Sequence, residues 1–174
     1  ITTVVENVQI DKEGTITHYI HSSSPLDTKS LVNAEIKGRI DWEQRFSNMQ
    51  QHSGEHIFSG IVHEKYGYDN VGFHLSDNSV TMDYNGILSP DEVAEIEALV
   101  NEVIVSNVDI TCSFPKESKL VSIDYRCKGE LAGDIRIVEI AGVDICACCC
   151  PHVRKTGEIG LLKVCLLYTS DAAD

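Results

Sequence analysis

Alternating apolar and polar residues mark two short β-segments near the start of the chain. Residues 4–10 and 15–20 show this alternation, and the turn-forming sequence Asp11-Lys12-Glu13-Gly14 lies between them. A period of two is typical of strands that bury one face. With another β-segment expected within 31–40, the pattern predicts part of a small antiparallel β-barrel.

Helical periodicity replaces this alternation over residues 47–66. The apolar positions fall on one helical face, and Gly67 is a typical stop signal. These positions are Met49, Ile57, Phe58, Ile61 and Val62.

A second helix is predicted to begin at Ser89. The serine can cap the first turn, Pro90 suits the first helical position, and Glu92 completes a capping box. The apolar stripe of this helix consists of Val93, Ile96, Val100, Val103 and Ile104. We interpret the helix as structural.

Strands account for most of the remaining pattern. We expect a strand, a turn and a strand over 72–84, and further β-segments at 108–114, 120–125, 134–140 and 160–164. The predicted fold class is therefore α+β, an antiparallel sheet with packed helices, preceded by the partial β-barrel.

This organisation predicts three regions. Residues 1–46 form the N-terminal β-barrel lobe, 47–164 form the main domain, and 165–174 form a tail of doubtful origin with no functional role. The chain starts with Ile1, and its last residues neither continue a strand alternation nor cap a helix. We therefore expect a fragment of a longer protein.

Composition favours a globular protein with one substantial core. The chain has 174 residues, of which 43% are hydrophobic, and no run approaches the roughly 18 apolar residues that span a bilayer. The start also lacks the features of a signal peptide, so we expect a cytoplasmic protein. Seven cysteines, three of them consecutive at 148–150, fit metal binding in a reducing compartment better than a disulfide framework.

The net charge of −13 argues against indiscriminate nucleic-acid binding, because phosphate affinity comes from Lys and Arg. Between Lys65 and Lys116 the only Lys, Arg, Asp or Glu residues are acidic. Positive charges lie instead on both sides of the cysteine run, at Lys116, Lys119, Arg126, Lys128, Arg154, Lys155 and Lys163. Two interpretations stay open, a face that holds one specific polyanion or ordinary solvated charges.

Two pairs of metal-binding residue types share one spacing. His52 and His56 lie four residues apart, and so do Cys148 and His152. Positions four apart on a helix have side chains about 5–6 Å from each other, so both imidazoles can reach one ion. Zinc accepts imidazole nitrogen and thiolate sulfur in tetrahedral geometry. The four residues therefore predict a shared Zn²⁺ site.

Each pair alone has an ordinary explanation. A single His-x-x-x-His arises by chance on amphipathic helices, and cysteine-rich segments usually form disulfides or structural zinc sites. The coincidence of both pairs favours one metal, with Cys148 as the thiolate ligand because it alone keeps the four-residue interval to His152. Neither common glycine-rich nucleotide-binding motif is present.

Several motifs together resemble those of the alanyl-tRNA editing proteins, free-standing relatives of the editing domain of alanyl-tRNA synthetase. They are Met49-Gln50-Gln51-His52-Ser53-Gly54-Glu55-His56, Val71-Gly72-Phe73-His74-Leu75, Arg136-Ile137-Val138-Glu139-Ile140, Cys148-Cys149-Cys150-Pro151-His152 and Thr156-Gly157-Glu158-Ile159-Gly160. The similarity covers about residues 30–164. It implies an editing-domain-like fold, a zinc site formed by the paired motifs, mischarged tRNA-Ala as substrate, and hydrolysis of a seryl or glycyl ester.

The chain departs from the pattern of that family in three ways. The synthetase domain commonly reads Cys-Gly-Gly-Thr-His where this chain has Cys148-Cys149-Cys150-Pro151-His152. The threonine after the first histidine is Ser53 here, and a glutamine of the synthetase domain becomes Asn70.

Ester cleavage by zinc needs no nucleophilic side chain, because the metal polarises a carbonyl and acidifies a bound water. A site made for alanine cannot strongly reject an amino acid that merely adds a hydroxyl group, so a second site must hydrolyse the wrong product. That second site needs a group that recognises the hydroxyl. Ser53 is our candidate, with His74 as a polar wall of the pocket. The alternatives are a solvent-facing serine and an ordinary strand histidine. Glu55 could act as a base through water, but we favour its interpretation as a surface carboxylate.

Two other functions remain in competition with editing. His52-Ser53-Gly54-Glu55-His56 also fits the HxxEH signature of zinc metallopeptidases, in which the glutamate activates water. That class needs a further carboxylate ligand on another helix, which the sequence does not clearly supply. The third interpretation is a non-enzymatic module that binds RNA or a protein partner and is stabilised by zinc.

Overall fold

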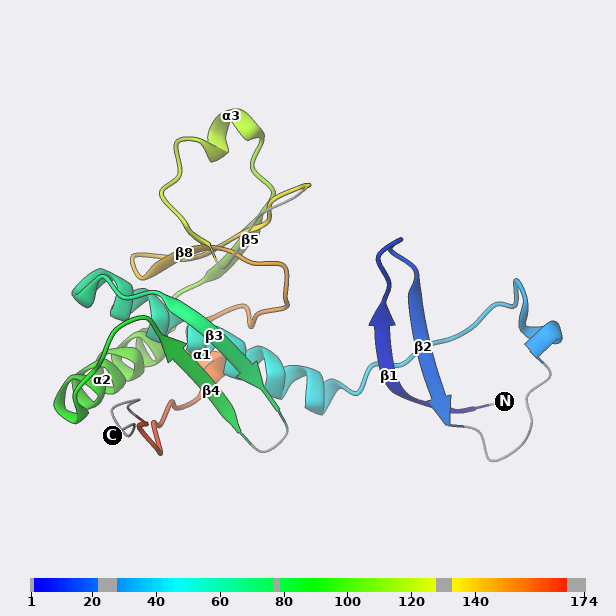
Figure 1. Ribbon diagram of the computed structural model, residues 1–174, viewed down its shortest axis with the longest axis horizontal. Helices are drawn as coiled ribbons and strands as arrows, with labels where there is room; N and C mark the ends of the chain where they lie inside the picture. The colour runs from blue at the N-terminus through cyan, green and yellow to red at the C-terminus, as the bar shows by residue number, and fades with distance from the viewer. Residues whose placement is uncertain (1, 22–27, 77–78, 128–132, 169–174) are drawn as a thin grey trace, which may run out of the picture. The chain divides into compact units, whose positions relative to one another are not determined.

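The computed structural model describes residues 2–21, 28–76, 79–127 and 133–168. The chain forms two compact units, Ile1–Arg39 and Ile40–Asp174 (Figure 1). The roles predicted for residues 1–46, 47–164 and 165–174 stay predictions, and residues 169–174 lie outside the described part.

The first unit contains an antiparallel pair of strands, β1 (Val4–Ile10) and β2 (Ile16–His21), as predicted. The Asp11 carboxylate accepts hydrogen bonds from the backbone N–H groups of Glu13 and Thr15 in the connecting turn. Gly14 has a φ of 84°, which a residue without Cβ adopts at little cost. The turn chemistry therefore sets the register of this pair.

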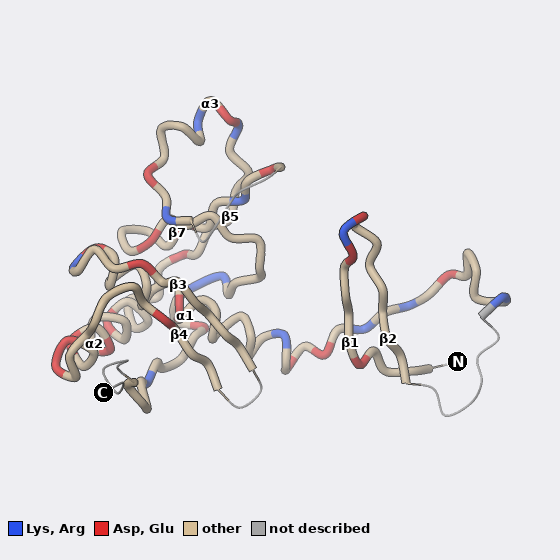
Figure 2. Tube along the Cα trace, viewed as in Figure 1, with Lys and Arg blue, Asp and Glu red and all other residues tan. Residues whose placement is uncertain are grey.

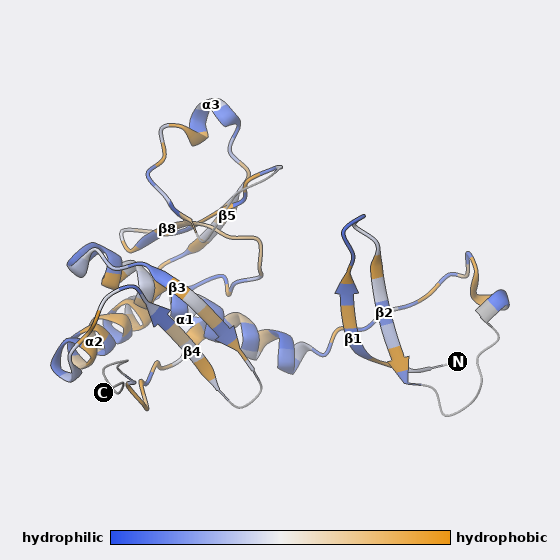
Figure 3. Ribbon diagram, in the orientation of Figure 1, coloured by the Kyte–Doolittle hydropathy of each residue, from blue (hydrophilic) through white to orange (hydrophobic). Residues whose placement is uncertain are grey.

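The β-segment expected within 31–40 is wrong. A 3-10 helix, η1 (Thr28–Leu31), and a turn occupy its start, and residues 34–40 have no regular secondary structure. The apolar side chains of Ile36 and Ile40 are exposed, so no neighbouring strand fixes this segment. The described part of the unit contains one two-stranded sheet, and the small β-barrel is not confirmed. Figure 3 shows apolar residues along both strands.

The first helix of the second unit, α1 (Trp42–Tyr66), begins earlier than predicted. Asp41 explains the difference, because its carboxylate accepts a hydrogen bond from the backbone N–H of Gln44 and caps the first turn. The helix ends as predicted at Gly67, whose φ is 69°. Its central residues, 53–62, are all buried.

A hairpin and a second helix follow, both as predicted. Strands β3 (Asn70–Leu75) and β4 (Val80–Tyr84) pair antiparallel, and α2 (Pro90–Ser106) begins with the capping box of Ser89 and Glu92. Helices α1 and α2 pack together around a shared apolar core. The core includes Ile57, Val62, Ile96, Val100, Val138 and Ile140.

The remaining strands form one sheet in the order β5-β7-β8-β6. They are β5 (Ile110–Ser113), β6 (Arg126–Cys127), β7 (Ile137–Ile140) and β8 (Asp144–Ala147). Because β6 runs parallel to β8, the sheet is mixed rather than purely antiparallel.

The strand predicted at 120–125 is wrong. Residues 121–122 form a turn and 123–125 have no regular secondary structure, and residue 120 is the last residue of a short helix, α3 (Glu117–Leu120). Its backbone N–H groups bond locally, as in the bond from Leu120 to the carbonyl of Lys116. Local bonding of this kind leaves the segment without the ladder that a strand requires.

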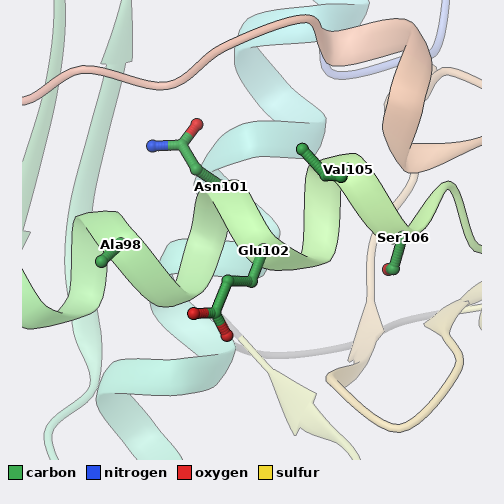
Figure 4. A pocket seen from close by; sticks show the side chains of 5 residues that line it. All are labelled: Ala98, Asn101, Glu102, Val105 and Ser106. Atoms are coloured by element: carbon green, nitrogen blue, oxygen red, sulfur yellow. The ribbon is translucent and has the colours of Figure 1, made fainter.

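The strand predicted at 160–164 is also wrong. A 3-10 helix, η2 (Thr156–Ile159), precedes it, and residues 160–168 have no regular secondary structure. Asn101 on α2 donates to the Leu162 carbonyl and accepts from the Leu162 N–H at 2.9 and 3.0 Å. Its side chain extends from α2 on the side opposite Glu102 (Figure 4). The Asn101 side chain thus bonds the N–H and C=O groups of Leu162, which in a strand would pair with a neighbouring strand.

Charge on the second unit is uneven. Acidic residues concentrate on α2, as Figure 2 shows, at Asp91, Glu92, Glu95, Glu97 and Glu102. An open pocket on the same helix is lined by Ala98, Asn101, Glu102, Val105 and Ser106 (Figure 4). Among the described residues, no helix combines the length and apolarity needed to cross a bilayer.

Replacing Asn101 tests the attachment of the last segment. Asn101→Ala leaves the N–H and C=O of Leu162 without their partners, so the free energy of unfolding should fall by about 1–3 kcal/mol. Urea denaturation followed by circular dichroism measures this change. Asn48→Ala is the control, because Asn48 accepts only a hydrogen bond from Gln44 on its own helix. Equal stability of the two variants would contradict the proposed attachment.

Candidate metal centre

Helix α1 supplies two imidazoles from its buried central part. His52 and His56 are one helical turn apart, and their ring centroids are 4.9 Å from each other in an edge-to-face arrangement. His56 is 1% exposed, whereas His52 is partly accessible. The four-residue spacing therefore places both rings on one face, as the sequence predicts.

The second pair comes from the loop that follows β8. Cys148 follows the last residue of β8, and its N–H donates to the carbonyl of Arg136 at 3.0 Å. The His152 ring lies 4.1 Å from that of His52 and 4.5 Å from that of His56. The donor atoms of all four residues lie within 4.8 Å of one another. The structure thus brings together every residue predicted as a metal ligand.

The outer nitrogens of the α1 histidines are hydrogen-bonded. His52 Nδ1 lies 3.2 Å from the Pro151 carbonyl, and His56 Nδ1 lies 3.0 Å from an oxygen of Asp144. A carbonyl or an ionised carboxylate only accepts, so each Nδ1 donates. In a neutral ring that donates through Nδ1, Nε2 keeps its lone pair for a metal.

Ser53 holds the third imidazole. Its Oγ lies 3.1 Å from His152 Nδ1 and accepts the backbone N–H of Val153 at 3.1 Å. Ser53 is 0% exposed. In this structure the hydroxyl therefore bonds a ligand histidine, and its predicted recognition of a substrate hydroxyl stays a prediction.

Arg136 holds the cysteine run. Its guanidinium donates to the carbonyls of Cys148 and Cys150 at 3.0 and 2.8 Å. Cys149 and Cys150 are exposed, whereas Cys148 is partly buried and belongs to the cluster. Only the first cysteine of the run is therefore a member of this four-residue group.

The donor set fits zinc in type, and one donor–donor distance matches that of a tetrahedral site. A tetrahedral site with bonds of about 2.0–2.3 Å places neighbouring donors about 3.3–3.7 Å apart. The distance from Cys148 Sγ to His52 Nε2 is 3.5 Å. Burial raises the pKa of the Cys148 thiol to about 11, and a metal would have to displace its proton.

Glu55 differs from its predicted surface position. It is 1% exposed, and its Oε1 accepts hydrogen bonds from Ser59 at 2.6 Å and from Asn70 at 2.9 Å. Tyr84 extends this network through a 2.9 Å bond with Ser59, and burial raises the pKa of its hydroxyl. The reason for the wrong prediction is that the β3–β4 hairpin covers this face of α1 with polar partners.

The structure does not bring His74 into the cluster. Its side chain is exposed, while the preceding residue, Phe73, stacks on His52 with ring centroids 5.6 Å apart. Successive residues of a strand point to opposite faces, so Phe73 is the residue of β3 that lies beside the metal-binding group. The predicted role of His74 as a pocket wall stays a prediction.

Two residues of the site were missed from the sequence. Asp144 contacts His56, and Arg126 donates to both oxygens of Asp144 at 2.8 and 3.0 Å. Burial acts to raise the pKa of Asp144, but the hydrogen bonds from His56 and Arg126 lower it, and the net shift is downward. The sequence contains no motif or regular spacing that links Arg126 to Asp144 or Asp144 to His56. Arg126, which the sequence grouped with surface charges, has a side chain only 11% exposed.

Comparison with known proteins gives a consistent result. Residues 135–171 match the family model of the threonyl and alanyl tRNA synthetase second additional domain. The chain is 33% identical over 168 residues to the alanyl-tRNA editing protein AlaX-M of Saccharolobus solfataricus, an alignment that covers 92% of this chain and 69% of that protein.

Longer relatives match over a smaller share of their length. Identity is 29% over 163 residues to the alanyl-tRNA editing protein AlaX-L of Pyrococcus horikoshii, covering 91% of this chain and 39% of that protein. Identity is 33% over 141 residues to the alanyl-tRNA editing protein Aarsd1 of Danio rerio, covering 75% of this chain and 32% of that protein. The chain therefore spans well under half of these two relatives.

Removing the hydroxyl of Ser53 tests its contact with His152. Ser53→Ala leaves the buried groups of His152 and Val153 without this partner, so we expect the free energy of unfolding to fall by about 1–3 kcal/mol. Chemical denaturation provides the measurement. Ser106→Ala removes an exposed hydroxyl that bonds only a carbonyl of its own helix and should change stability by less than about 0.5 kcal/mol. A neutral Ser53→Ala would show that the hydroxyl does not hold the loop.

Proposed function

The chain belongs to the alanyl-tRNA editing protein family, and from this premise we propose that it is a zinc-dependent aminoacyl-tRNA deacylase. Its substrate in this proposal is tRNA-Ala that carries serine or glycine in place of alanine. The reaction is hydrolysis of the ester between the amino acid and the tRNA, in trans to the synthetase.

One observation carries the proposal, the convergence of three imidazoles and one thiol within 4.8 Å. Zinc held by His52, His56, Cys148 and His152 would supply Lewis-acid polarisation of the ester carbonyl and acidification of a bound water. No serine or cysteine nucleophile is required for that chemistry.

Exposure indicates the side from which a substrate reaches the cluster. His56 and His152 are buried, whereas His52 and Cys148 are partly accessible. Phe73, half-buried against His52, lies on this accessible side and can exclude water from a bound ester. We propose that the aminoacyl group approaches between Phe73 and Cys148, while the buried histidines hold the metal.

The tRNA backbone needs positive charge that is open to solvent. Arg126 does not provide it, because its guanidinium bonds the buried carboxylate of Asp144. Lys116 and Lys119 at α3 and Arg154 after His152 are exposed, and we propose that they contact phosphate groups. Lys128, which the sequence also grouped here, lies outside the described residues.

The contact that bears on the peptidase alternative joins Glu55 Oε2 to His56 Nε2 at 4.0 Å. A metallopeptidase of the HxxEH class uses its glutamate to activate water, but Glu55 Oε1 is bonded by Ser59 and Asn70. The fourth donor is the Cys148 thiol rather than a carboxylate. A non-enzymatic zinc module would hold the same metal and leave both esters and peptides uncleaved.

The direct test is deacylation by the zinc-loaded chain, with matched cysteine variants. We expect hydrolysis of seryl-tRNA-Ala to exceed that of alanyl-tRNA-Ala at least tenfold, a ratio that a site recognising a hydroxyl can reach. Cys148→Ala should lose both zinc and activity, and Cys149→Ala should keep both, because Cys149 is exposed and lies outside the four-residue group. Released serine and bound zinc are measured on the same preparations.

Three outcomes would contradict this proposal. Zinc binding without hydrolysis of either ester favours the binding module. Cleavage of a peptide that Glu55→Gln abolishes favours the peptidase. Loss of zinc in Cys149→Ala, with zinc retained in Cys148→Ala, would show that the thiolate ligand is assigned wrongly.

The raised pKa of Cys148 makes a separate prediction about pH. The thiol is protonated below about pH 11, and its ligating form is the thiolate, so zinc binding releases one proton. The apparent zinc affinity should therefore rise with pH below about pH 11, by about tenfold per pH unit for the one proton released. Competition with a chelator of known affinity measures the slope. An affinity independent of pH in this range would show that no protonated thiol is displaced.

A further inference from the structure

A second group of metal-binding residue types lies next to the proposed centre. His56, Asp144 and Cys146 have donor atoms within 4.8 Å of one another, and all three are buried. His56 belongs to both groups. The second group is therefore either another cation site bridged by His56 or a support for the first site.

Arg126 decides between these interpretations. Its Nε donates to Asp144 Oδ1 at 2.8 Å and its Nη2 donates to Asp144 Oδ2 at 3.0 Å. The carboxylate already has a positive partner in a two-point contact, which is the strong form of this pairing. A divalent cation bound there would face the guanidinium at close range in a buried site, which is strongly unfavourable. The second group is therefore a support rather than a metal site.

The fold sets this arrangement through register and through one glycine. Arg126 is the register partner of Cys146 in the parallel pair β6–β8, so both side chains lie on the same face of the sheet. Asp144 and Cys146 alternate with Ile145 and share that face. A Cβ atom at Gly60 on α1 would lie 2.9 Å from Asp144 Cβ. The glycine, four residues after His56, thus allows β8 to approach the helix closely enough for the carboxylate to reach the ring.

We propose that Arg126 and Asp144 are positioning residues that orient His56 for metal binding. Arg126 holds the Asp144 carboxylate, and the carboxylate accepts the proton on Nδ1 of His56 at 3.0 Å. This bond fixes both the ring orientation and the tautomer, so that Nε2 presents its lone pair to the cluster. The inference rests on the proposed zinc centre and adds two residues that the paired motifs do not contain.

The first test uses the wild-type chain without metal. Nitrogen-15 NMR of the histidine rings distinguishes the two neutral tautomers, which differ in the ring nitrogen that carries the proton. The proposed positioning of His56 by Arg126 and Asp144 requires the ring to carry its proton on Nδ1. The nitrogen-15 chemical shifts of the two ring nitrogens show which one carries it. A proton on Nε2 of His56 would overturn the proposal, and no variant or bound zinc is needed for this result.

The second test measures zinc affinity by competition with a chelator. Asp144→Asn should weaken zinc binding about 10–100-fold, because an amide can turn its NH₂ group toward His56 and favour the other tautomer. Glu139→Gln is the matched control, since it changes an exposed carboxylate on the neighbouring strand β7 and should leave the affinity unchanged. Arg126→Lys keeps the charge but loses the two-point contact, so we expect a smaller loss.

The outcomes separate this inference from the proposed function. One zinc per wild-type chain with weakened binding in Asp144→Asn supports it, and circular dichroism must show that the variant remains folded. If that variant does not fold, the result for Arg126→Lys and the tautomer of His56 decide the question. If the folded Asp144→Asn variant binds zinc as tightly as the wild type, the positioning role of Asp144 is overturned but the zinc centre is not. Two zinc ions per chain would show that the second group binds metal, and no zinc at all would overturn both.

Discussion

The contact between His56 and Asp144 is the interaction on which the rest of the site depends. It joins α1 to β8 at 3.0 Å, between side chains that are 2% exposed on each partner. The loop after β8 carries the second pair of metal-binding residues, so the position of β8 against the helix determines where Cys148 and His152 lie. If this contact is lost, the buried Nδ1–H of His56 loses its acceptor, while Asp144 keeps only Arg126, and the ring of His56 loses the bond that orients it toward the other three donors.

Hydrogen bonds to other elements explain why α1 is polar in its most buried part. Ser53, Glu55 and Ser59 are at most 1% exposed, although they lie in the middle of a core helix. Each has hydrogen-bonding partners from other elements, Ser53 from the loop after β8 and Glu55 from β3. Such a helix is stable only when the surrounding elements are in place. The metal site and the tertiary fold are therefore expected to form together, and a bound metal would add its binding free energy to the stability of the folded state.

The sequence predicted the elements and donors that local signals encode. The capped start of α2, the helical spacing of His52 and His56, and the paired strands of the β3–β4 hairpin all follow from periodicity over short distances. Elements and contacts that depend on residues distant in the sequence were either missed or predicted wrongly. The segment 160–164 has a strand-like pattern, but Asn101 of α2 bonds its backbone, and no local rule connects Arg126 with Asp144. Glu55 was placed on the surface because its burial depends on a hairpin that follows it in the chain.

X-ray absorption at the zinc edge tests most directly whether these four side chains form one metal centre. For the chain loaded with one equivalent of zinc, we expect one sulfur at about 2.3 Å and three nitrogens at about 2.0–2.1 Å. This pattern corresponds to Cys148 with His52, His56 and His152, the donors within 4.8 Å of one another. A zinc shell with two or more sulfurs would place Cys149 or Cys150 at the metal, and a shell without sulfur would remove Cys148 from it. Either result would contradict the central claim.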